Sequence, residues 1–237
     1  MLDDSQVERV LVITAHPDDV DFGAAGTIAG WTDAGIEVSY CIITDGDAGG
    51  FDHSVQRHEI GGIRQAEQRA AGKEVGVDNI VFLGYSDGRL AVGLDLRRDL
   101  ARVIREVRPQ RVLCQSPERN MLRIPASHPD HLAAGEAALC AVYPDSRNPF
   151  AYSELADLEA WTVQETWVMG MERANRYVDI TDRLDRKLAA LSRHQSQLPN
   201  GIEGVTPIVR EWNAFNAKNG GLPDGHFAEA FWVIETG

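Results

Sequence analysis

Residues Val7–Asp19 read VERVLVITAHPDD, and this stretch decides the fold. The run Val7–Ala15 is apolar and rich in β-branched residues, and it stops abruptly at His-Pro-Asp-Asp. Such a pattern predicts a buried strand that leads into a loop. A helical pattern follows over Phe22–Ala34 and ends at Gly35, a residue suited to the position after a helix. The start of the chain therefore predicts a strand, a polar loop and a helix.

The same alternation continues along the chain. Further strands are predicted at Ile36–Thr44, Ile80–Leu83 and Arg111–Gln115, and helices at Val55–Val75, at Leu94–Val107 and from about Pro129. Strands that alternate with helices are typical of a parallel sheet with helices on both faces. In the less regular last third, we expect strands at Trp161–Met169, Arg176–Ile180 and Phe227–Ile234 and a helix at Asp182–His194. No linker precedes this part, so we predict one domain over residues 1–237.

Composition narrows the class of protein. The 237 residues include 36 acidic and 23 basic side chains, for a net charge of −13. Binding to nucleic acid needs clustered positive charge, so nucleic acid is not an expected partner. No apolar run is long enough to cross a membrane, and no signal peptide is recognisable. Cys41, Cys114 and Cys140 are odd in number and lie in apolar stretches, which predicts reduced thiols and a cytoplasmic location.

The tripeptide His-Pro-Asp occurs twice, in HPDD at His16–Asp19 and in HPDH at His128–His131. Both copies lie where a predicted strand gives way to a helix. Open α/β sheets bind ligands outside the carboxyl ends of their strands. We therefore expect the two copies to meet in space.

These residue types suit a catalytic metal. Two imidazoles and one carboxylate, from His16, Asp19 and His131, form a three-ligand set for zinc that leaves a fourth position for water. Asp18 fits the base that takes a proton from that water, and His128 fits an acid or electrostatic partner.

Several neighbouring polar residues have a functional and an ordinary interpretation. Asp130 can hydrogen-bond an imidazole and raise its pKa, or it can be an acid in the first turn of a helix. Arg64 and Asp87 can bind vicinal hydroxyls by hydrogen bonds, but Arg64 with Glu67 can equally form a solvated ion pair on a helix face. Asp45 and Asp47, in the turn after the second strand, are more typical of turn formation.

These motifs resemble the LmbE-like, or PIG-L, family of zinc-dependent N-deacetylases. The resemblance covers nearly the whole chain and rests on AHPDDVDFGAAGTIAGW (Ala15–Trp31), TDGDAGG (Thr44–Gly50), RQAEQRAA (Arg64–Ala71), LGYSDG (Leu83–Gly88), SHPDH (Ser127–His131), YVDIT (Tyr177–Thr181), HQSQ (His194–Gln197) and FAEAF (Phe227–Phe231).

The resemblance implies a Rossmann-like α/β sandwich, with a mostly parallel sheet flanked by helices and a small mixed C-terminal part. It implies removal of an acetyl group from an N-acetylglucosamine-type conjugate, a small-molecule substrate, and a homo-oligomer in many members. The site residues it implies are zinc ligands His16, Asp19 and His131, the base Asp18, the acid His128 oriented by Asp130, and sugar-binding Arg64 and Asp87.

One position departs from the family pattern. Some members carry a tyrosine two residues before the HPDH histidine, where it helps to stabilise the oxyanion, and here that place is Ala126. The preceding loop, Pro117–Pro125, contains Glu118, Arg119, Asn120 and Arg123. It is long enough to form a wall of the pocket and to influence which substrate fits.

Other functions stay open on the sequence alone. An amidase that cleaves another amide of a sugar conjugate would use the same groups, and metals other than zinc would fit them. Two histidines and a carboxylate also form the facial triad of non-haem iron oxygenases, although those triads usually lie on a different, all-β fold. A sugar-binding module with a structural metal is a third possibility.

Overall fold

The computed structural model describes residues 1–121 and 124–237. Its strands are β1 (Arg9–Thr14), β2 (Glu37–Thr44), β3 (Asn79–Tyr85), β4 (Arg111–Gln115), β5 (Glu165–Met169), β6 (Arg176–Asp179) and β7 (Ala228–Glu235). Its longer helices are α1 (Asp19–Asp33), α2 (Arg57–Glu74), α3 (Leu94–Val107), α4 (Pro129–Cys140), α5 (Leu184–Leu191) and α6 (Gly201–Asn219).

The strands form one seven-stranded sheet in the order β3-β2-β1-β4-β5-β7-β6. Strands β1 to β5 pair in parallel, whereas β7 runs antiparallel to both of its neighbours. The predicted α/β fold, with a mostly parallel sheet and a mixed C-terminal part, is therefore confirmed. Between β1 and β4 the strand order reverses, and this is the position at which sheets of this kind place their ligand sites.

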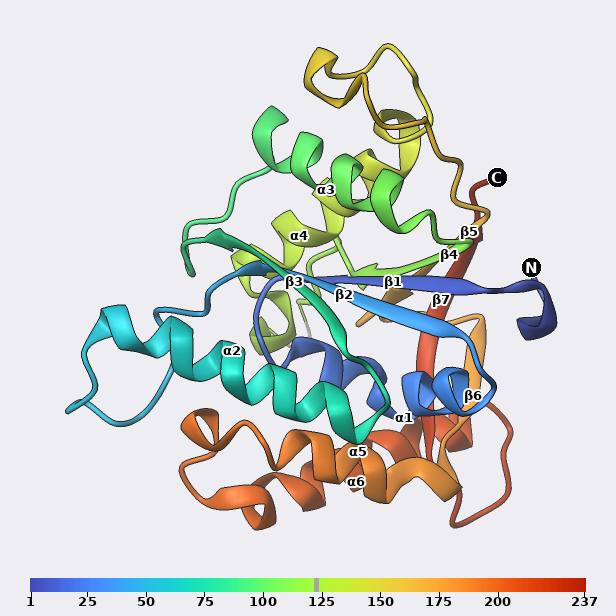
Figure 1. Cartoon of the computed structure of the whole chain (residues 1–237). Coiled ribbons are helices and arrows are strands. Elements are labelled where there is room, and N and C mark those ends of the chain that lie inside the picture. Colours follow the sequence, from blue (N-terminus) through green and yellow to red (C-terminus); the bar gives the residue numbers. More distant parts are fainter. Residues whose placement is uncertain (122–123) are drawn as a thin grey trace.

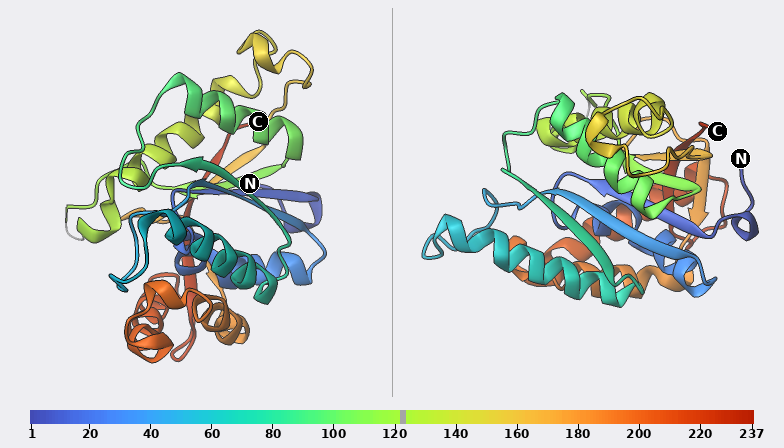
Figure 2. Two further views of the ribbon diagram at one scale, coloured as in Figure 1. Left: turned by 60° about the vertical axis from the view of Figure 1, so that its left-hand side comes forward. Right: turned by 45° about the horizontal axis from the view of Figure 1, so that its top comes forward.

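Helices cover both faces of the sheet (Figures 1 and 2). Alternate side chains of β1 point to opposite layers, as the two-residue period of a strand requires. Val10 and Val12 pack in a core with α1, whereas Leu11 and Ile13 pack in a second core with α3 and α4. Helices α5 and α6 lie outside α1, at the bottom of Figure 1.

Three predicted elements differ from the structure by more than two residues at one end. The helix predicted over Phe22–Ala34 begins earlier, at Asp19. The predicted strand Trp161–Met169 begins at Glu165 instead, and the predicted helix Asp182–His194 is shorter, with a 3-10 turn before α5. Helix α6 has no counterpart among the predicted elements, because Gly201, Gly204 and Pro207 break the helical pattern of its first turns. Among the described residues, no helix is both long and apolar enough to cross a membrane.

Candidate metal centre and active site

The loop after β1 turns sharply to start α1. Asp18 stands before the first turn of α1 with a φ of 94°, in the left-handed region that a residue with a side chain rarely adopts. The backbone N–H of His16 donates to Asp19 Oδ2 over 2.7 Å, which closes the turn. Such a conformation costs about 1–3 kcal/mol and persists where neighbouring groups fix it, often at functional sites.

The second copy of the motif begins α4. His128 is the N-cap of this helix, Pro129 occupies its first turn as predicted, and His131 follows within that turn. Gly135, one turn further along, packs against the backbone of Gln115 at the end of β4, where a Cβ atom would collide with the Gln115 carbonyl oxygen. This close approach fixes α4, and with it both histidines, beside the end of β4, which is the neighbour of β1.

Three predicted metal ligands converge at this point. His16 Nδ1 lies 3.2 Å from His131 Nε2 and 3.3 Å from Asp19 Oδ2, and His131 Nε2 lies 2.9 Å from Asp19 Oδ1. The prediction that the two His-Pro-Asp copies meet is therefore confirmed. Donors of zinc lie about 2.0–2.2 Å from the metal, so atoms that share one ion are separated by about 3 Å, as here.

The charges around these residues favour a cation. Burial lowers the pKa of His16, but the carboxylates of Asp19, Asp130 and Asp87 outweigh burial and raise this pKa to about 12. The pKa of Asp19 is held well below its usual range, because His131 and His16 overcome the effect of burial. This donor set of two imidazoles and a carboxylate, in an acidic setting, fits a divalent metal ion.

The carboxylate of Asp130 orients His16, whereas its backbone N–H contacts His128. Its Oδ2 lies 3.1 Å from His16 Nε2, and its two oxygens also accept the backbone N–H groups of Gly88 and Leu90. Asp130 therefore hydrogen-bonds an imidazole through its carboxylate, as its chemistry predicted, and it also contacts His128, the partner implied by the family resemblance, through its backbone N–H. A carboxylate on the far nitrogen of a metal-binding histidine fixes the ring and makes it a better ligand.

His128 is held by the backbone. Its Nδ1 accepts the N–H of Asp130, so the proton of the neutral ring is on Nε2. Burial, together with the charges of His16 and His131, lowers the pKa of His128. The ring lies 4.9 Å from His16 and 5.4 Å from His131, between ring centroids. It is therefore a neutral hydrogen-bond donor beside the predicted metal ligands.

Arg64 braces the loop that carries Asp18. Its guanidinium, 4% exposed, donates to the carbonyl oxygens of Pro17 and Gly46 and lies 3.2 Å from Asp18 Oδ2. Burial raises the pKa of Asp18 to about 6, with Arg64 opposing this rise and Asp19 adding to it. A carboxyl with such a pKa accepts and returns protons readily near neutral pH.

The structure rejects the solvated ion pair between Arg64 and Glu67. Glu67 instead accepts hydrogen bonds from the backbone N–H and the hydroxyl of Ser196. Asp87 is buried against His16 Nε2 at 3.2 Å and against Arg64 at 3.6 Å. Both predicted sugar-binding residues thus reach the site, but the contacts they make here are with protein groups, and their contact with a substrate stays a prediction.

The two acids of the turn after β2 also bond to protein groups. Asp45 accepts from Gln65, and Asp47 accepts the backbone N–H of Asp87 and pairs with Arg57. Their role is to fix the loops around the site, in agreement with the turn-forming interpretation.

Sequence reasoning missed a buried network behind Asp18. Gln68 accepts the Asp18 backbone N–H through Oε1 and donates through Nε2 to Asp21 Oδ2, each over 2.8 Å. His194 Nε2 lies 2.8 Å from the same Asp21 oxygen. Gln68 stands four residues after Arg64 and so on the same face of α2, a spacing that could have revealed it.

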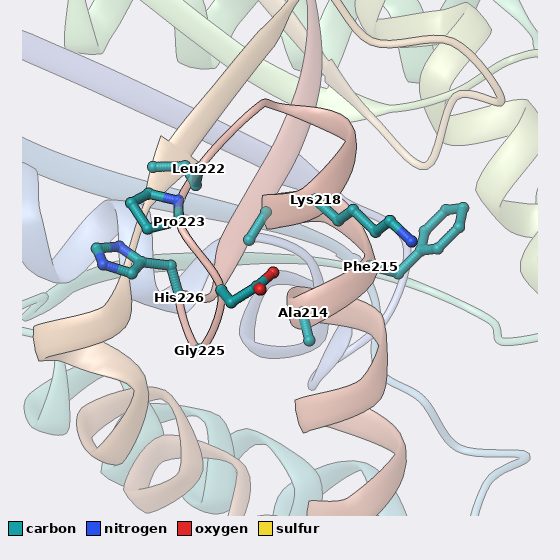
Figure 3. A pocket seen from close by; sticks show the side chains of 9 residues that line it. Ala214, Phe215, Lys218, Leu222, Pro223, Gly225 and His226 are labelled. Atoms are coloured by element: carbon teal, nitrogen blue, oxygen red, sulfur yellow. The ribbon is translucent and has the colours of Figure 1, made fainter.

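A cavity of about 600 Å³ reaches the candidate metal centre at Asp19 and His131. Asn120 lines it, which confirms that the loop after β4 forms a wall of the pocket. Arg123 lies outside the described residues, as do the side chains of Pro125 and Ala126. A second hollow, of about 290 Å³, lies between the end of α6 and the loop before β7 and contains none of the predicted site residues (Figure 3).

Two other groups of donors could hold a metal, namely His16–His128–His131 and His16–Asp87–Asp130. In the second group both Asp130 oxygens already accept backbone N–H groups, and His16 would have to use Nε2, the nitrogen on the buried side. The group built on Asp19 uses His16 Nδ1 and faces the cavity through Asp19 and His131. We therefore favour the group with Asp19.

Comparison with known proteins identifies the family of the chain. The family model described as PIG-L, GlcNAc-PI de-N-acetylase, matches residues 11–142, more than half of the chain. The chain belongs to the PIG-L family. Among its PIG-L relatives is the diacetylchitobiose deacetylase of Thermococcus kodakarensis, 35% identical over 92% of this chain and 80% of that protein.

Two further matches extend the comparison. A probable N-acetyl-α-D-glucosaminyl L-malate deacetylase 2 of Bacillus cereus is 32% identical over 89% of this chain and 93% of that protein. The structure of the N,N′-diacetylchitobiose deacetylase of Pyrococcus horikoshii, in complex with an inhibitor, superimposes with a TM-score of 0.90 at 31% identity, covering 98% of this chain and 85% of that one. These three relatives are thus named as deacetylases of N-acetylglucosamine-type compounds.

Proposed function

We propose that this chain is a metal-dependent deacetylase that hydrolyses the acetamido group of an N-acetylglucosamine-type conjugate to acetate and a free amine. The observation that carries the proposal is the convergence of His16 Nδ1, Asp19 and His131 Nε2 within 3.3 Å of one another, at the end of a cavity. Membership of a family of deacetylases supports the same reaction.

His16, Asp19 and His131 would hold the metal, for which zinc is the first candidate because it prefers nitrogen and carboxylate ligands. A bound zinc ion would polarise the acetamide carbonyl and bring the pKa of water from 15.7 to about 7. Asp130 keeps His16 in the tautomer that presents Nδ1 to this ion. The cavity gives a substrate access to the same point, which argues against a closed structural site.

Asp18 and His128 are the groups that would move or hold protons. The carboxylate of Asp18, steadied by Arg64, accepts a proton from the attacking water and passes it to the departing amine. His128 donates a hydrogen bond through Nε2 to the carbonyl oxygen as negative charge develops on it. This donor takes on the task that a tyrosine at the position of Ala126 serves in some relatives.

The non-haem iron oxygenase is the weaker candidate. The parallel α/β sheet and the PIG-L relatives both favour hydrolysis. An amidase that cleaves a different amide of a sugar conjugate would use the same machinery. Identifying the carboxylic acid that hydrolysis releases distinguishes the two enzymes, because a deacetylase releases acetate and this amidase releases another acid.

The test is acetate release from N,N′-diacetylchitobiose by the zinc-loaded protein, with and without chelation. Asp18→Asn is expected to retain near-stoichiometric metal and to lose about 10²–10⁴-fold in kcat, because it removes the base and leaves the ligands. Asp78→Asn, at an exposed position between α2 and β3, is the matched control. Activity indifferent to chelation would refute the proposal, and release of metal by Asp18→Asn would mean that Asp18 and Asp19 exchange roles.

A further inference from the structure

A line of buried polar side chains runs from the last third of the chain to the loop that carries Asp18. His194 Nε2 lies 2.8 Å from Asp21 Oδ2, and Gln68 Nε2 donates to the same oxygen over 2.8 Å. Gln68 Oε1 in turn accepts the backbone N–H of Asp18. These three side chains are at most 1% exposed. His194, which follows α5, is thus connected through two side chains to the residue proposed as the base.

The chemistry of these groups fixes the direction of each hydrogen bond. A carboxylate oxygen only accepts, so His194 carries a proton on Nε2 and Gln68 turns its amide nitrogen toward Asp21. The amide oxygen of Gln68 is then the atom that faces the Asp18 N–H. The orientation of this amide depends on the Asp21 carboxylate, which His194 helps to hold.

The polar line borders an apolar core to which α1, α2 and α5 contribute Ala24, Ala71 and Ala190. Burial of polar groups costs desolvation, and replacing a whole network by apolar groups of the same shape is often close to neutral for stability. The presence of a polar network here therefore indicates a role other than stability. Its end at the backbone of Asp18, where φ is 94°, indicates that the role concerns this residue.

The turn that begins at His194 is also fixed to α2. The backbone N–H and the hydroxyl of Ser196 donate to Glu67 on that helix. Arg64, on the same helix, lies 3.2 Å from Asp18 Oδ2. Helix α2 therefore contacts both the turn that carries His194 and the carboxylate of Asp18, so the position of one is tied to that of the other.

We propose that His194 is a positioning residue for the hydrolysis: through Asp21 and Gln68, it holds the Asp18 carboxylate where it takes a proton from the attacking water. This inference rests on the proposed function and adds to it a residue from the last third of the chain. A purely structural contact between α5 and α1 would affect stability and leave the rate of the folded enzyme unchanged. The two roles therefore give different results in a kinetic experiment.

The first experiment measures kcat and KM on N,N′-diacetylchitobiose, and bound zinc, for His194→Met and His194→Gln. Methionine donates no hydrogen bond, whereas the amide nitrogen of glutamine is as many bonds from Cα as Nε2 of histidine. His194→Met is expected to lose about tenfold or more in kcat, with KM within about twofold and bound zinc unchanged, since a misplaced base slows the chemical step. His194→Gln is expected to stay within about threefold of the parent because it restores the donor. Parent-like kcat in His194→Met, or equal losses in the two variants, overturns the proposal.

The matched control is His226→Met. His226 also pairs with an aspartate, Asp179, over 2.7 Å, but it lies beside the second hollow (Figure 3). Its replacement is expected to keep kcat within about twofold of the parent, since sites without shared partners act independently. Urea unfolding of each variant sets conditions in which the protein is folded, so that a lower rate is not a smaller folded fraction. A loss of kcat in His226→Met equal to that in His194→Met counts against a specific link to Asp18.

A double variant tests whether His194 acts through Asp18. In protein that already carries Asp18→Asn, adding His194→Met is expected to change the residual kcat by less than about twofold, because the base to be positioned is absent. Adding it to Gln68→Met is likewise expected to cost less than about twofold beyond Gln68→Met alone. A further tenfold loss in either background shows an action on another group and overturns the proposal.

Hydrogen exchange of the Asp18 backbone amide separates this proposal from the proposed function. Exchange, followed by NMR in the same samples, is expected to speed up about tenfold or more in His194→Met and to stay within about twofold in His226→Met. If exchange speeds up but the parent releases no acetate, the proposed function fails and the contact through Asp21 and Gln68 stands. If the parent releases acetate and the exchange in His194→Met is unchanged, the positioning role fails and the proposed function stands.

Discussion

Replacing Gln68 by methionine tests whether the strained turn at Asp18 matters for catalysis. Methionine has a similar length but cannot accept the Asp18 N–H or donate to Asp21, so two hydrogen bonds of 2.8 Å are lost. Leaving such a group unsatisfied costs about 1–3 kcal/mol of unfolding free energy. His194 still donates a hydrogen bond to Asp21 in this variant, so the loss of unfolding free energy should stay in this range.

The effect on catalysis should be larger than the effect on stability suggests. The φ of 94° at Asp18 is strained, and the contact with Gln68 helps to hold it. If the turn relaxes, the Asp18 carboxylate moves, and a displacement of about 1 Å costs about 100-fold in rate. We therefore expect kcat for acetate release to fall about 100-fold, with bound metal unchanged, because Gln68 touches none of the three ligands.

The matched control is Gln65→Met. Gln65 lies on the same helix and donates to Asp45 instead of supporting Asp18. The assay pairs kcat and KM with metal analysis and urea unfolding for both variants. The reasoning is refuted if Gln68→Met keeps the kcat of the control, or if its loss of rate comes with a loss of metal.

Three further predictions follow from other contacts. Asp130→Asn is expected to lower metal affinity about 10–100-fold, as measured by calorimetry, and unchanged affinity would contradict its role behind His16. Gly135→Ala should lower the free energy of unfolding by about 1–3 kcal/mol because its methyl group meets the β4 backbone, and parent-like stability in urea would contradict this packing. Lys187→Met leaves the buried carboxylate of Glu229 without its cation and should lower the free energy of unfolding by about 3–5 kcal/mol. Adding Glu229→Gln should recover part of this loss. Equal stability of the single and double variants would argue against the pair.

Much of the fold follows from local pattern. The run before His16 predicts β1 because a fully buried parallel strand needs continuous apolar residues. The bounds of α3 agree with the prediction because its amphipathic pattern is uninterrupted. Helix α6 escaped prediction because tertiary packing, against β7 and α5, overrides two glycines and a proline in its early turns.

The sequence predicted which residues gather at the site better than it predicted their hydrogen-bond partners. The repeated His-Pro-Asp motif located His16 and His131, because both follow neighbouring parallel strands at the point where the strand order reverses. It could not show which imidazole Asp130 serves, since that depends on the angle between α4 and the loop after β1. The residues of α6 that line the cavity, such as Trp212 and Asn216, were not predicted because the helix itself was not predicted.

The most direct experiment is a crystal of the zinc-loaded protein measured with anomalous scattering at the zinc edge. A peak about 2.0–2.2 Å from His16 Nδ1, His131 Nε2 and an Asp19 oxygen is the expected result. A peak between His16 Nε2, Asp87 and Asp130, or no peak near His16 at full zinc loading, would contradict the proposed metal centre.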